Sequence, residues 1–111
     1  MFSKVTLSAV QGLLAGEVYV IEEPKLVVIG RETDCNIVIP AEKDPQLSRY
    51  HCILDFNPPN VFIEDIGSTN GTVVNGRNIQ DDEEPVPLKN GDEVCLGTTV
   101  FRIDVEFESI V

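Results

Sequence analysis

Residues 48–76 read SRYHCILDFNPPNVFIEDIGSTNGTVVNG, and the rest of the chain is organised around this stretch. It holds three polar pieces, Ser48-Arg49-Tyr50-His51, Gly67-Ser68-Thr69-Asn70-Gly71 and Asn75-Gly76, separated by runs of apolar and β-branched residues. Each polar piece therefore falls beside a turn, at the end of an expected strand. Because loops on a rigid scaffold usually carry binding residues, the stretch predicts a binding site made of loops.

The whole chain predicts many short strands. Apolar and β-branched residues alternate with polar ones in short runs, and turn residues recur about every 8–12 residues. No segment of ten residues shows a helical period, and there is no internal repeat. We expect strands at residues 4–10, 17–21, 26–29, 37–39, 50–56, 61–66, 72–74, 77–79, 86–88, 93–96 and 99–107. This pattern predicts an all-β sandwich or barrel.

Two pairs of strands are expected to form hairpins. Residues 50–56 and 61–66 are joined by Asn57-Pro58-Pro59-Asn60 and should pair antiparallel. The strands on either side of Asn75-Gly76 should pair as well. Asn-Gly is the strongest short hairpin signal because both residues of that turn need a positive φ.

The polar residues are of the kinds that bind a phosphate group and the peptide that carries it. An arginine donates two parallel hydrogen bonds, hydroxyls donate to phosphate oxygens, and a carboxamide both donates and accepts. Arg31 follows an expected strand at a glycine, so it can reach a ligand; a surface ion pair with Glu32 or Asp34 is the alternative. Ser48 can donate to a phosphate or cap local backbone groups in a turn.

Four motifs occur in a fixed order: Gly30-Arg31, Ser48-Arg49-x-His51, Gly67-Ser68-Thr69-Asn70-Gly71-Thr72 and Asn75-Gly76. Together they resemble the signature of the forkhead-associated (FHA) domain, a β-sandwich module that binds phosphothreonine peptides. The resemblance covers residues 30–76, and the apolar rhythm on both sides fits the remainder of such a domain. It implies an antiparallel β-sandwich of two sheets, with the binding loops at one end, in a single domain over residues 1–111.

The resemblance also implies a role for each motif residue. The phosphopeptide-binding residues would be Arg31, Ser48, Arg49, Thr69 and Asn70. The residues that support the binding loops would be Gly30, His51, Gly71, Asn75 and Gly76. Thr69 would contact the phosphate through its hydroxyl, and Asn70 would bond to the peptide backbone, which a carboxamide matches as donor and acceptor. The partner would be a phosphothreonine-containing protein in a Ser/Thr kinase pathway.

A hydrolase is the rival interpretation from another class. Ser48, His51 and an aspartate such as Asp55 or Asp65 are the residue types of a catalytic triad. Ser48 and His51 are three residues apart at an expected strand start, so they should project to opposite faces, and no G-x-S-x-G elbow is present. The resemblance implies that His51 braces the loops, so no catalytic residue is expected.

A third interpretation is a phosphate-independent interaction or self-association module. In that case the same loops only hold the sandwich together. Comparing one peptide with and without its phosphate separates this interpretation from phosphopeptide binding.

The charge of the chain limits the ligands that it can bind. The formal net charge of −11 repels nucleic acid and anionic membranes, so neither is an expected partner. It also repels a phosphopeptide at long range, which means that a phosphate site must be a local positive spot. Four of the few cations, Arg31, Lys43, Arg49 and Arg77, lie in or beside the signature region.

The sequence shows no sign of export or of a membrane span. Its apolar fraction of 42% is enough for a core in a chain of 111 residues. No apolar run approaches the roughly 18 residues of a span, and Met1-Phe2-Ser3-Lys4 lacks the apolar block of a secretory signal. We expect a cytoplasmic protein.

No cofactor or metal is expected. Cys35, Cys52 and Cys95 are widely spaced and odd in number, which does not suit a disulfide framework. A zinc site that combines them with His51 lacks the usual C-x₂-C pair. The run Asp81–Glu84 lacks calcium-loop spacing and favours a solvated acidic loop. The loop Pro40–Leu47 is long and acidic for the family pattern, which leaves its contact with a ligand open.

Overall fold

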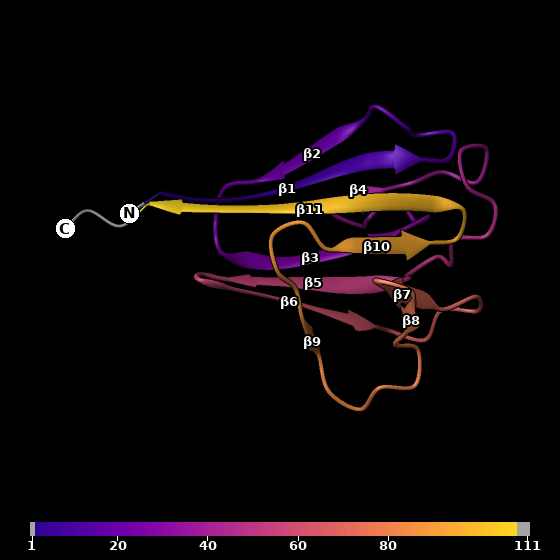
Figure 1. Cartoon of the computed structure of the whole chain (residues 1–111). Coiled ribbons are helices and arrows are strands. Elements are labelled where there is room, and N and C mark those ends of the chain that lie inside the picture. Colours follow the sequence, from indigo (N-terminus) through magenta and orange to yellow (C-terminus); the bar gives the residue numbers. More distant parts are fainter. Residues whose placement is uncertain (1, 109–111) are drawn as a thin grey trace.

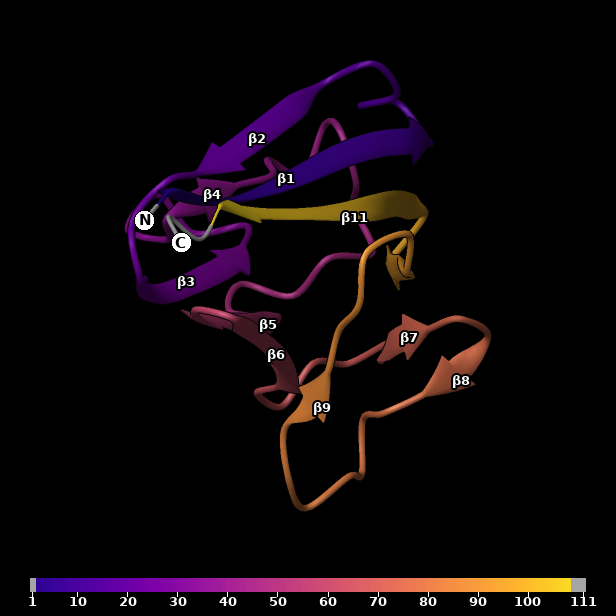
Figure 2. The ribbon, with the colours of Figure 1, turned by 60° about the vertical axis from the view of Figure 1, so that its left-hand side comes forward.

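The computed structural model describes residues 2–108 and shows two stacked β-sheets (Figures 1 and 2). The strands are β1 (Phe2–Gln11), β2 (Val18–Ile21), β3 (Lys25–Gly30), β4 (Ile37–Val38), β5 (Cys52–Asn57), β6 (Asn60–Asp65), β7 (Thr72–Val74), β8 (Arg77–Asn78), β9 (Val86–Pro87), β10 (Glu93–Leu96) and β11 (Thr99–Glu108). Every expected strand is present, with ends within two residues of the prediction. Residues 1 and 109–111 lie outside the described part, so a single domain over 1–111 stays a prediction.

The topology is that of a β-sandwich. One sheet has the order β2-β1-β11-β10-β7-β8 and the other β4-β3-β5-β6-β9. Both predicted hairpins are confirmed: β5 pairs antiparallel with β6, and β7 pairs antiparallel with β8. At the second turn Asn75 has a φ of 48° and Gly76 a φ of 84°, which is the conformation that Asn-Gly favours.

One strand pair departs from the predicted antiparallel arrangement. β4 lies parallel to β3, with Ile37 opposite Ile29. The cause is local: the Asn36 amide donates to the Val28 carbonyl at 3.0 Å, and Asn36 Oδ1 accepts from the Val28 amide at 2.8 Å. The loop after β3 therefore folds back to the level of Val28 before the chain runs forward again. The two sheets form a sandwich with one mixed sheet.

The core lies between the sheets and follows the alternation of the strands. Inward side chains of the longer strands are almost fully buried, among them Val5, Leu7, Val27, Ile29, Leu54, Phe56, Ile63, Phe101 and Ile103. Burying a side chain of this size stabilises the fold by roughly 1.5–3 kcal/mol. This apolar layer fixes both sheets and so fixes the strand ends from which the loops extend.

The loops named by the sequence motifs meet at one end of the sandwich. The pairings Ile29 with Cys52 and Cys52 with Asp65 place the end of β3, the start of β5 and the end of β6 side by side. This end is opposite to the one where β1 begins and β11 ends (Figure 1). The loops β3–β4, β4–β5 and β6–β7 are therefore neighbours in space.

Three further structural facts bear on function. All three cysteines are free; Cys35 and Cys52 are buried. Within residues 2–108 no group of His, Cys, Asp or Glu side chains is arranged to hold a metal ion. The same residues form no helix long and apolar enough to cross a membrane.

Candidate functional site

A groove of about 470 Å³ lies between the three loops. It is lined by Arg31, Pro45, Gln46, Leu47, Ser48, Arg49, Tyr50, Ile66, Gly67, Thr69 and Asn70. All five residues that the motifs predict to bind a phosphopeptide are in this set. The loop Pro40–Leu47, whose contact with a ligand the sequence left open, supplies one wall through its last three residues.

The groove is a positive spot on an acidic protein. Arg31 and Arg49 are the only lysine or arginine residues in its lining, and both are exposed. They are held close together because the Arg31 amide donates to the Ser48 and Arg49 carbonyls at 3.1 and 3.0 Å. Within the described chain Arg31 forms no ion pair with Glu32 or Asp34.

The acidic neighbour Asp34 instead accepts a hydrogen bond from the Tyr50 hydroxyl, 3.0 Å from each carboxylate oxygen. That hydrogen bond, more than the nearby negative charges, raises the pKa of Tyr50. Asp34 is thus tied to the rim of the groove by Tyr50, and the Arg31 guanidinium is left to the solvent in the groove.

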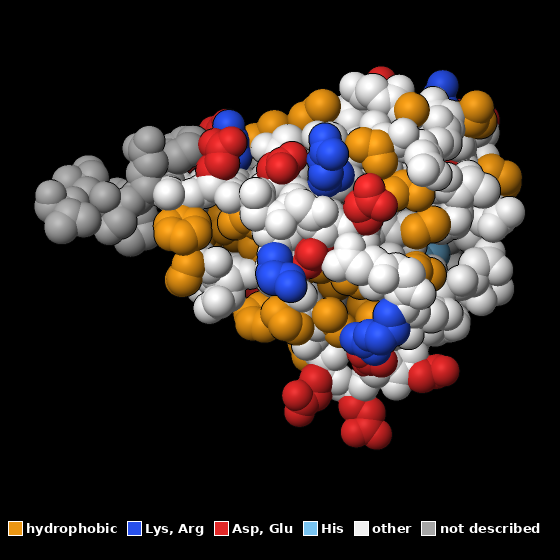
Figure 3. Space-filling view, viewed as in Figure 1, with side chains coloured by type: hydrophobic (Ala, Val, Ile, Leu, Met, Phe, Trp, Pro, Cys, Tyr) orange, Lys and Arg blue, Asp and Glu red, His pale blue; other side chains and the backbone are white. Residues whose placement is uncertain are grey.

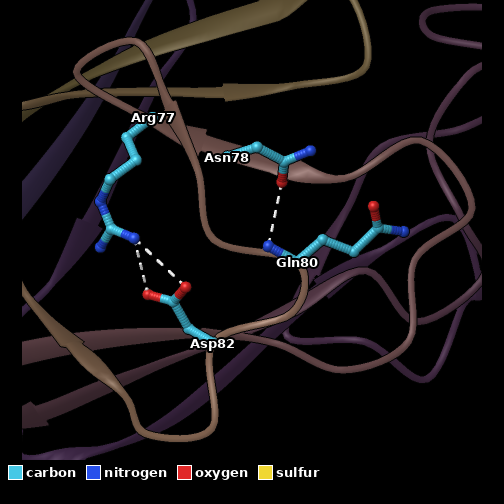
Figure 4. Close-up of polar contacts among 4 residues, drawn as sticks. All are labelled: Arg77, Asn78, Gln80 and Asp82. Carbon is cyan, nitrogen blue, oxygen red and sulfur yellow. Dashed lines mark hydrogen bonds and ion pairs between the residues drawn. The ribbon is translucent and has the colours of Figure 1, made fainter.

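The other two cations of the signature half lie outside the groove. Arg77 reaches across the turn after β8 and pairs with Asp82, with its Nη1 2.9 Å from Oδ2 (Figure 4). Lys43 is exposed and does not line the groove. Of the four cations in or beside the signature region, only Arg31 and Arg49 line the groove.

Ser48 connects the two sides of the groove. Its hydroxyl oxygen accepts from the Thr69 amide at 2.9 Å, across 21 residues of sequence. An oxygen that accepts in this way keeps its own hydrogen for donation. Ser48 therefore caps a distant backbone group, and its O–H can still donate to an anion in the groove.

Asn70 is exposed and also joins two loops. Its Nδ2 donates to the Gln46 carbonyl at 3.0 Å. This bond uses one of the two amide hydrogens, so the other hydrogen and the carboxamide oxygen are the groups that can meet a peptide. Thr69, next to it, is exposed on the same rim.

His51 is fully buried beneath these loops. Its Nδ1 accepts from the Ser48 amide at 3.0 Å, so the proton is on Nε2, which donates to the Gly71 carbonyl at 2.8 Å. Both ring nitrogens are thus engaged by main-chain groups, and the Ser48 hydroxyl is not a partner of the ring. The Ser–His pair that a hydrolase needs is not formed.

The expected geometry of His51 was nevertheless wrong. Opposite faces were predicted for Ser48 and His51 on the assumption that both lie in a strand. β5 begins only at Cys52. The chain bends at Arg49 and Tyr50, and the His51 ring accepts from the Ser48 amide.

Sequence reasoning missed the group that shapes the β6–β7 loop. It named Asp65 only as a triad alternative and gave no role to Ser68. The Asp65 carboxylate accepts from the amides of Gly67 and Ser68, each at 2.9 Å, and from the hydroxyls of Ser68 and Thr72. The hydroxyl oxygen of Ser68 in turn accepts from the Gly71 amide at 2.9 Å. An aspartate that lies two residues before a glycine and three residues before a serine is a recognisable turn signal.

These contacts also decide the ionisation of Asp65. Partial burial by itself would raise its pKa, but the hydrogen bonds from Ser68, Thr72 and Gly67 outweigh burial, and the net pKa lies below 3.8. The hydrogen bonds of the loop therefore stabilise the ionised form of Asp65 over its protonated form.

Sequence reasoning also gave no role to Asp44, which anchors the loop between β4 and β5. It is fully buried, and it accepts from the Thr99 hydroxyl at 2.7 Å and from the amides of Thr98 and Gln46 at 3.0 and 3.2 Å. These contacts fasten the Pro40–Leu47 loop to the turn between β10 and β11. Two of the partners are more than 50 residues away, so no local pattern announces them.

None of the five predicted support residues lines the groove. A Cβ on Gly30 would lie 2.2 Å from the Arg49 carbonyl oxygen, so this close approach of two backbones requires glycine. Asn75 donates to Asp92 at 3.0 Å and accepts from the Glu93 amide at 2.9 Å, which ties its turn to β10. The Gln80 side chain donates through Nε2 to the Ser68 carbonyl in the β6–β7 loop. The main-chain amide of Gln80 donates to Oδ1 of Asn78 (Figure 4).

The fold and the groove define a β-sandwich whose loops form a binding site at one end. The model of the FHA domain matches residues 27–97 of the sequence. The chain belongs to the FHA domain family, which is a family of binding modules.

Three relatives illustrate the likeness. The FHA domain of the CT664 protein from Chlamydia trachomatis is 30% identical with a TM-score of 0.78, over 95% of this chain and 99% of that one. A domain solved in work on phosphothreonine-dependent FHA domain interactions is 27% identical with a TM-score of 0.77, over 96% and 99%. The probable serine/threonine-protein kinase fhkA of Dictyostelium discoideum is 38% identical over 90 residues, 73% of this chain and 14% of the kinase.

Proposed function

We propose that the chain binds phosphothreonine in a partner protein and has no catalytic activity of its own. The observation that carries this proposal is the lining of the groove: two exposed guanidinium groups lie beside the hydroxyls of Ser48 and Thr69 and the carboxamide of Asn70 around one hollow, on a chain of net charge −11. The likeness to a domain with phosphothreonine-dependent interactions supports the choice of ligand.

The phosphate is bound by the cationic side of the groove. Arg31 donates two parallel bonds to phosphate oxygens, and Arg49 adds a second positive charge. Ser48 donates its remaining hydrogen to the phosphate, since its oxygen is already engaged by the Thr69 amide. These donors neutralise the phosphate locally, against the repulsion of the surrounding surface.

The peptide is held by the opposite rim. Thr69 contributes its hydroxyl to the phosphate, and Asn70 bonds to the peptide backbone beside the phosphoresidue. Asn70 is suited to this because one of its hydrogens is fixed on Gln46, which sets the plane of the carboxamide.

Preference for threonine over serine arises from contact of the γ-methyl group with apolar side chains of the groove, which are Pro45, Leu47 and Ile66. Burying one methyl stabilises the complex by about 0.8 kcal/mol. The expected preference is therefore only several-fold. The partner is a target of Ser/Thr kinases, and we place the interaction in the cytoplasm, whose reducing conditions suit three free thiols.

The decisive experiment is a binding screen with matched peptides. An array of phosphothreonine peptides is probed with the protein, and hits are titrated by calorimetry beside their phosphoserine and unphosphorylated forms. We expect binding that depends on the phosphate and is several-fold weaker for phosphoserine. Equal affinity for the unphosphorylated forms would show a phosphate-independent module, and hydrolysis of ester substrates would show an enzyme; either result overturns the proposal.

A further inference from the structure

The outer face of the five-stranded sheet carries a second hollow, separate from the groove described above. It encloses about 220 Å³ and is lined by Leu26, Ile53, Asp55, Phe62, Ile63, Glu64 and Pro85. None of these residues lines the first groove. The hollow is smaller than the roughly 300–1,000 Å³ of small-molecule sites, so it suits a protein side chain better.

Strand register explains how the hollow is built. Leu26 of β3 lies opposite Asp55 of β5, Asp55 lies opposite Phe62 of β6, and Phe62 lies opposite Pro87 of β9. One row across the sheet is therefore apolar except for a single carboxylate. Leu26 is 59% exposed, and Phe62 is half-buried.

A solvent-facing sheet surface is usually polar at its centre. In the six-stranded sheet the neighbouring strands β1 and β11 follow this rule with Thr6, Ser8, Arg102 and Asp104, while its edge strand β2 exposes Val18 and Val20. The hollow beside Leu26 departs from it, and exposed apolar surface with a polar rim marks interaction sites.

The two charged residues that line the hollow are both acidic. Asp55 and Glu64 line it, and no lysine or arginine does. Pro85 follows the exposed run Asp81–Glu84, whose acidic side chains project from the lower end of the molecule in Figure 3. Among these four, Asp82 is paired with Arg77 (Figure 4).

This charge pattern disfavours a second copy of the chain as the occupant. A two-fold contact through the face would bring Asp55 and Glu64 of both copies together between two chains of net charge −11. Like charges brought together in an interface cost several kcal/mol. The complementary partner is positively charged.

We propose that this face binds an unphosphorylated segment of a partner protein in which a large apolar side chain is flanked by lysine or arginine. The apolar side chain enters the hollow between Leu26 and Phe62, and the flanking cations meet Asp55 and Glu64. The contact is small compared with the ~800 Å² per partner of a stable interface, so it is a weak, transient one.

The test uses the whole ¹⁵N-labelled chain and short unphosphorylated peptides with a central phenylalanine. One peptide has lysines on both sides of the phenylalanine, a second has glutamates, and a third has lysines around a central serine. With the lysine–phenylalanine peptide we expect amide shifts that saturate on β3, β5 and β6 and are absent at Arg31 and Asn70. Binding should weaken about tenfold or more with either control peptide, and it should weaken as salt is added.

Two variants locate the contact. Leu26→Lys fills the hollow with a cation and should abolish the shifts, whereas Leu13→Lys, at a position 71% exposed in the turn after β1, should leave them unchanged. Asp55→Asn combined with Glu64→Gln should make the lysine- and glutamate-flanked peptides bind alike. Thermal melting shows that each variant is folded.

Three results would overturn this proposal: no shift on β3, β5 and β6 at millimolar peptide, equal shifts in Leu26→Lys, or concentration-dependent broadening of this face in the free protein, which shows self-association. Because the peptides carry no phosphate, failure here is distinguishable from failure of phosphothreonine binding.

Discussion

Nε2 of His51 lies 2.8 Å from the carbonyl oxygen of Gly71, and this hydrogen bond is completely buried. The other ring nitrogen accepts from the Ser48 amide, and the Ser48 hydroxyl accepts from the Thr69 amide. These contacts form a closed circuit through the two loops on either side of the groove. One buried ring therefore sets the distance between the cationic side of the groove and the rim that carries Thr69 and Asn70.

Gly30→Ala should be among the most destabilising single changes in the chain. The new Cβ would lie 2.2 Å from the Arg49 carbonyl oxygen and 2.9 Å from its carbon, and both are backbone atoms. We expect a loss of more than about 3 kcal/mol, beyond the usual cost of overpacking. Gly91→Ala is the matched control: it has a φ of 88° but open space around it, so strain of about 1 kcal/mol is expected. Urea unfolding measures both, and equal losses would contradict the close approach.

Asp65→Asn should reveal an acid-dependent part of the stability. The pKa of Asp65 is lower in the folded chain than the ordinary 3.8. The carboxylate therefore contributes stability that is complete above about pH 4 and is lost as the pH falls through the folded pKa. The asparagine variant leaves hydroxyls of Ser68 and Thr72 facing an amide, which costs about 1–3 kcal/mol near pH 7.

The check on Asp65 is a set of melting curves for both proteins at decreasing pH. The gap in melting temperature should be several degrees near neutrality and should narrow below about pH 4. A gap that stays constant across this range would show that the carboxylate form of Asp65 does not stabilise the loop.

The sequence predicted those parts of the fold that local signals determine. The strands Thr72–Val74 and Glu93–Leu96 were predicted with their observed bounds, and the Asn75-Gly76 turn was predicted in its place, because alternation and positive φ are local properties. The start of β5 was predicted two residues too early: the strand begins at Cys52, although the His51 amide still donates to the Ile29 carbonyl of β3. The parallel pairing of β4 was missed because it depends on where the Asn36 side chain bonds.

The same distinction holds for the site. The five residues predicted to bind a phosphopeptide line one groove, and their roles toward a ligand stay predictions. Asp44 could not have been found, because what fixes it is contact with Thr98 and Thr99 across the fold. The Asp65–Ser68 turn could have been found, since its signal lies within four residues.

Arg31→Ala should weaken binding of a phosphothreonine peptide by about tenfold or more, since hydrogen bonds to a charged group contribute about 1.5–3 kcal/mol. Melting should change little because the side chain is exposed. Arg77→Ala removes the same charge from the chain at a place outside the groove, where the side chain pairs with Asp82. Calorimetry should find its affinity close to wild type; equal losses in both variants would mean that only net charge matters.

Asn70→Ala should lower phosphopeptide affinity without a large change in stability. The side chain is exposed, so its bond to the Gln46 carbonyl contributes little to folding, but the groove loses both its peptide-facing groups and the tie to Gln46. A titration and a melting curve on the same sample decide the matter. Unchanged affinity for peptides that the wild type binds would show that Asn70 is only a turn residue.

His51→Ala should mainly lower the stability of the fold, and its loss of phosphopeptide affinity should be secondary. The change leaves the Ser48 amide and the Gly71 carbonyl without the ring that joins them, in a place that solvent does not reach. A buried polar group left unpaired costs about 1–3 kcal/mol, which in a domain of this size lowers the melting temperature by several degrees or more. Affinity, titrated well below both melting temperatures, should fall only because the two sides of the groove are no longer held together.

Asn70→Ala is the control for His51→Ala, since it removes a contact to the peptide and leaves the circuit through His51 intact. An esterase assay on the same samples separates bracing from catalysis: a hydrolase would lose turnover in His51→Ala whatever happened to its melting. If the melting temperature of His51→Ala equals that of the wild type, the ring does not brace the loops, and the circuit described above does not set the width of the groove.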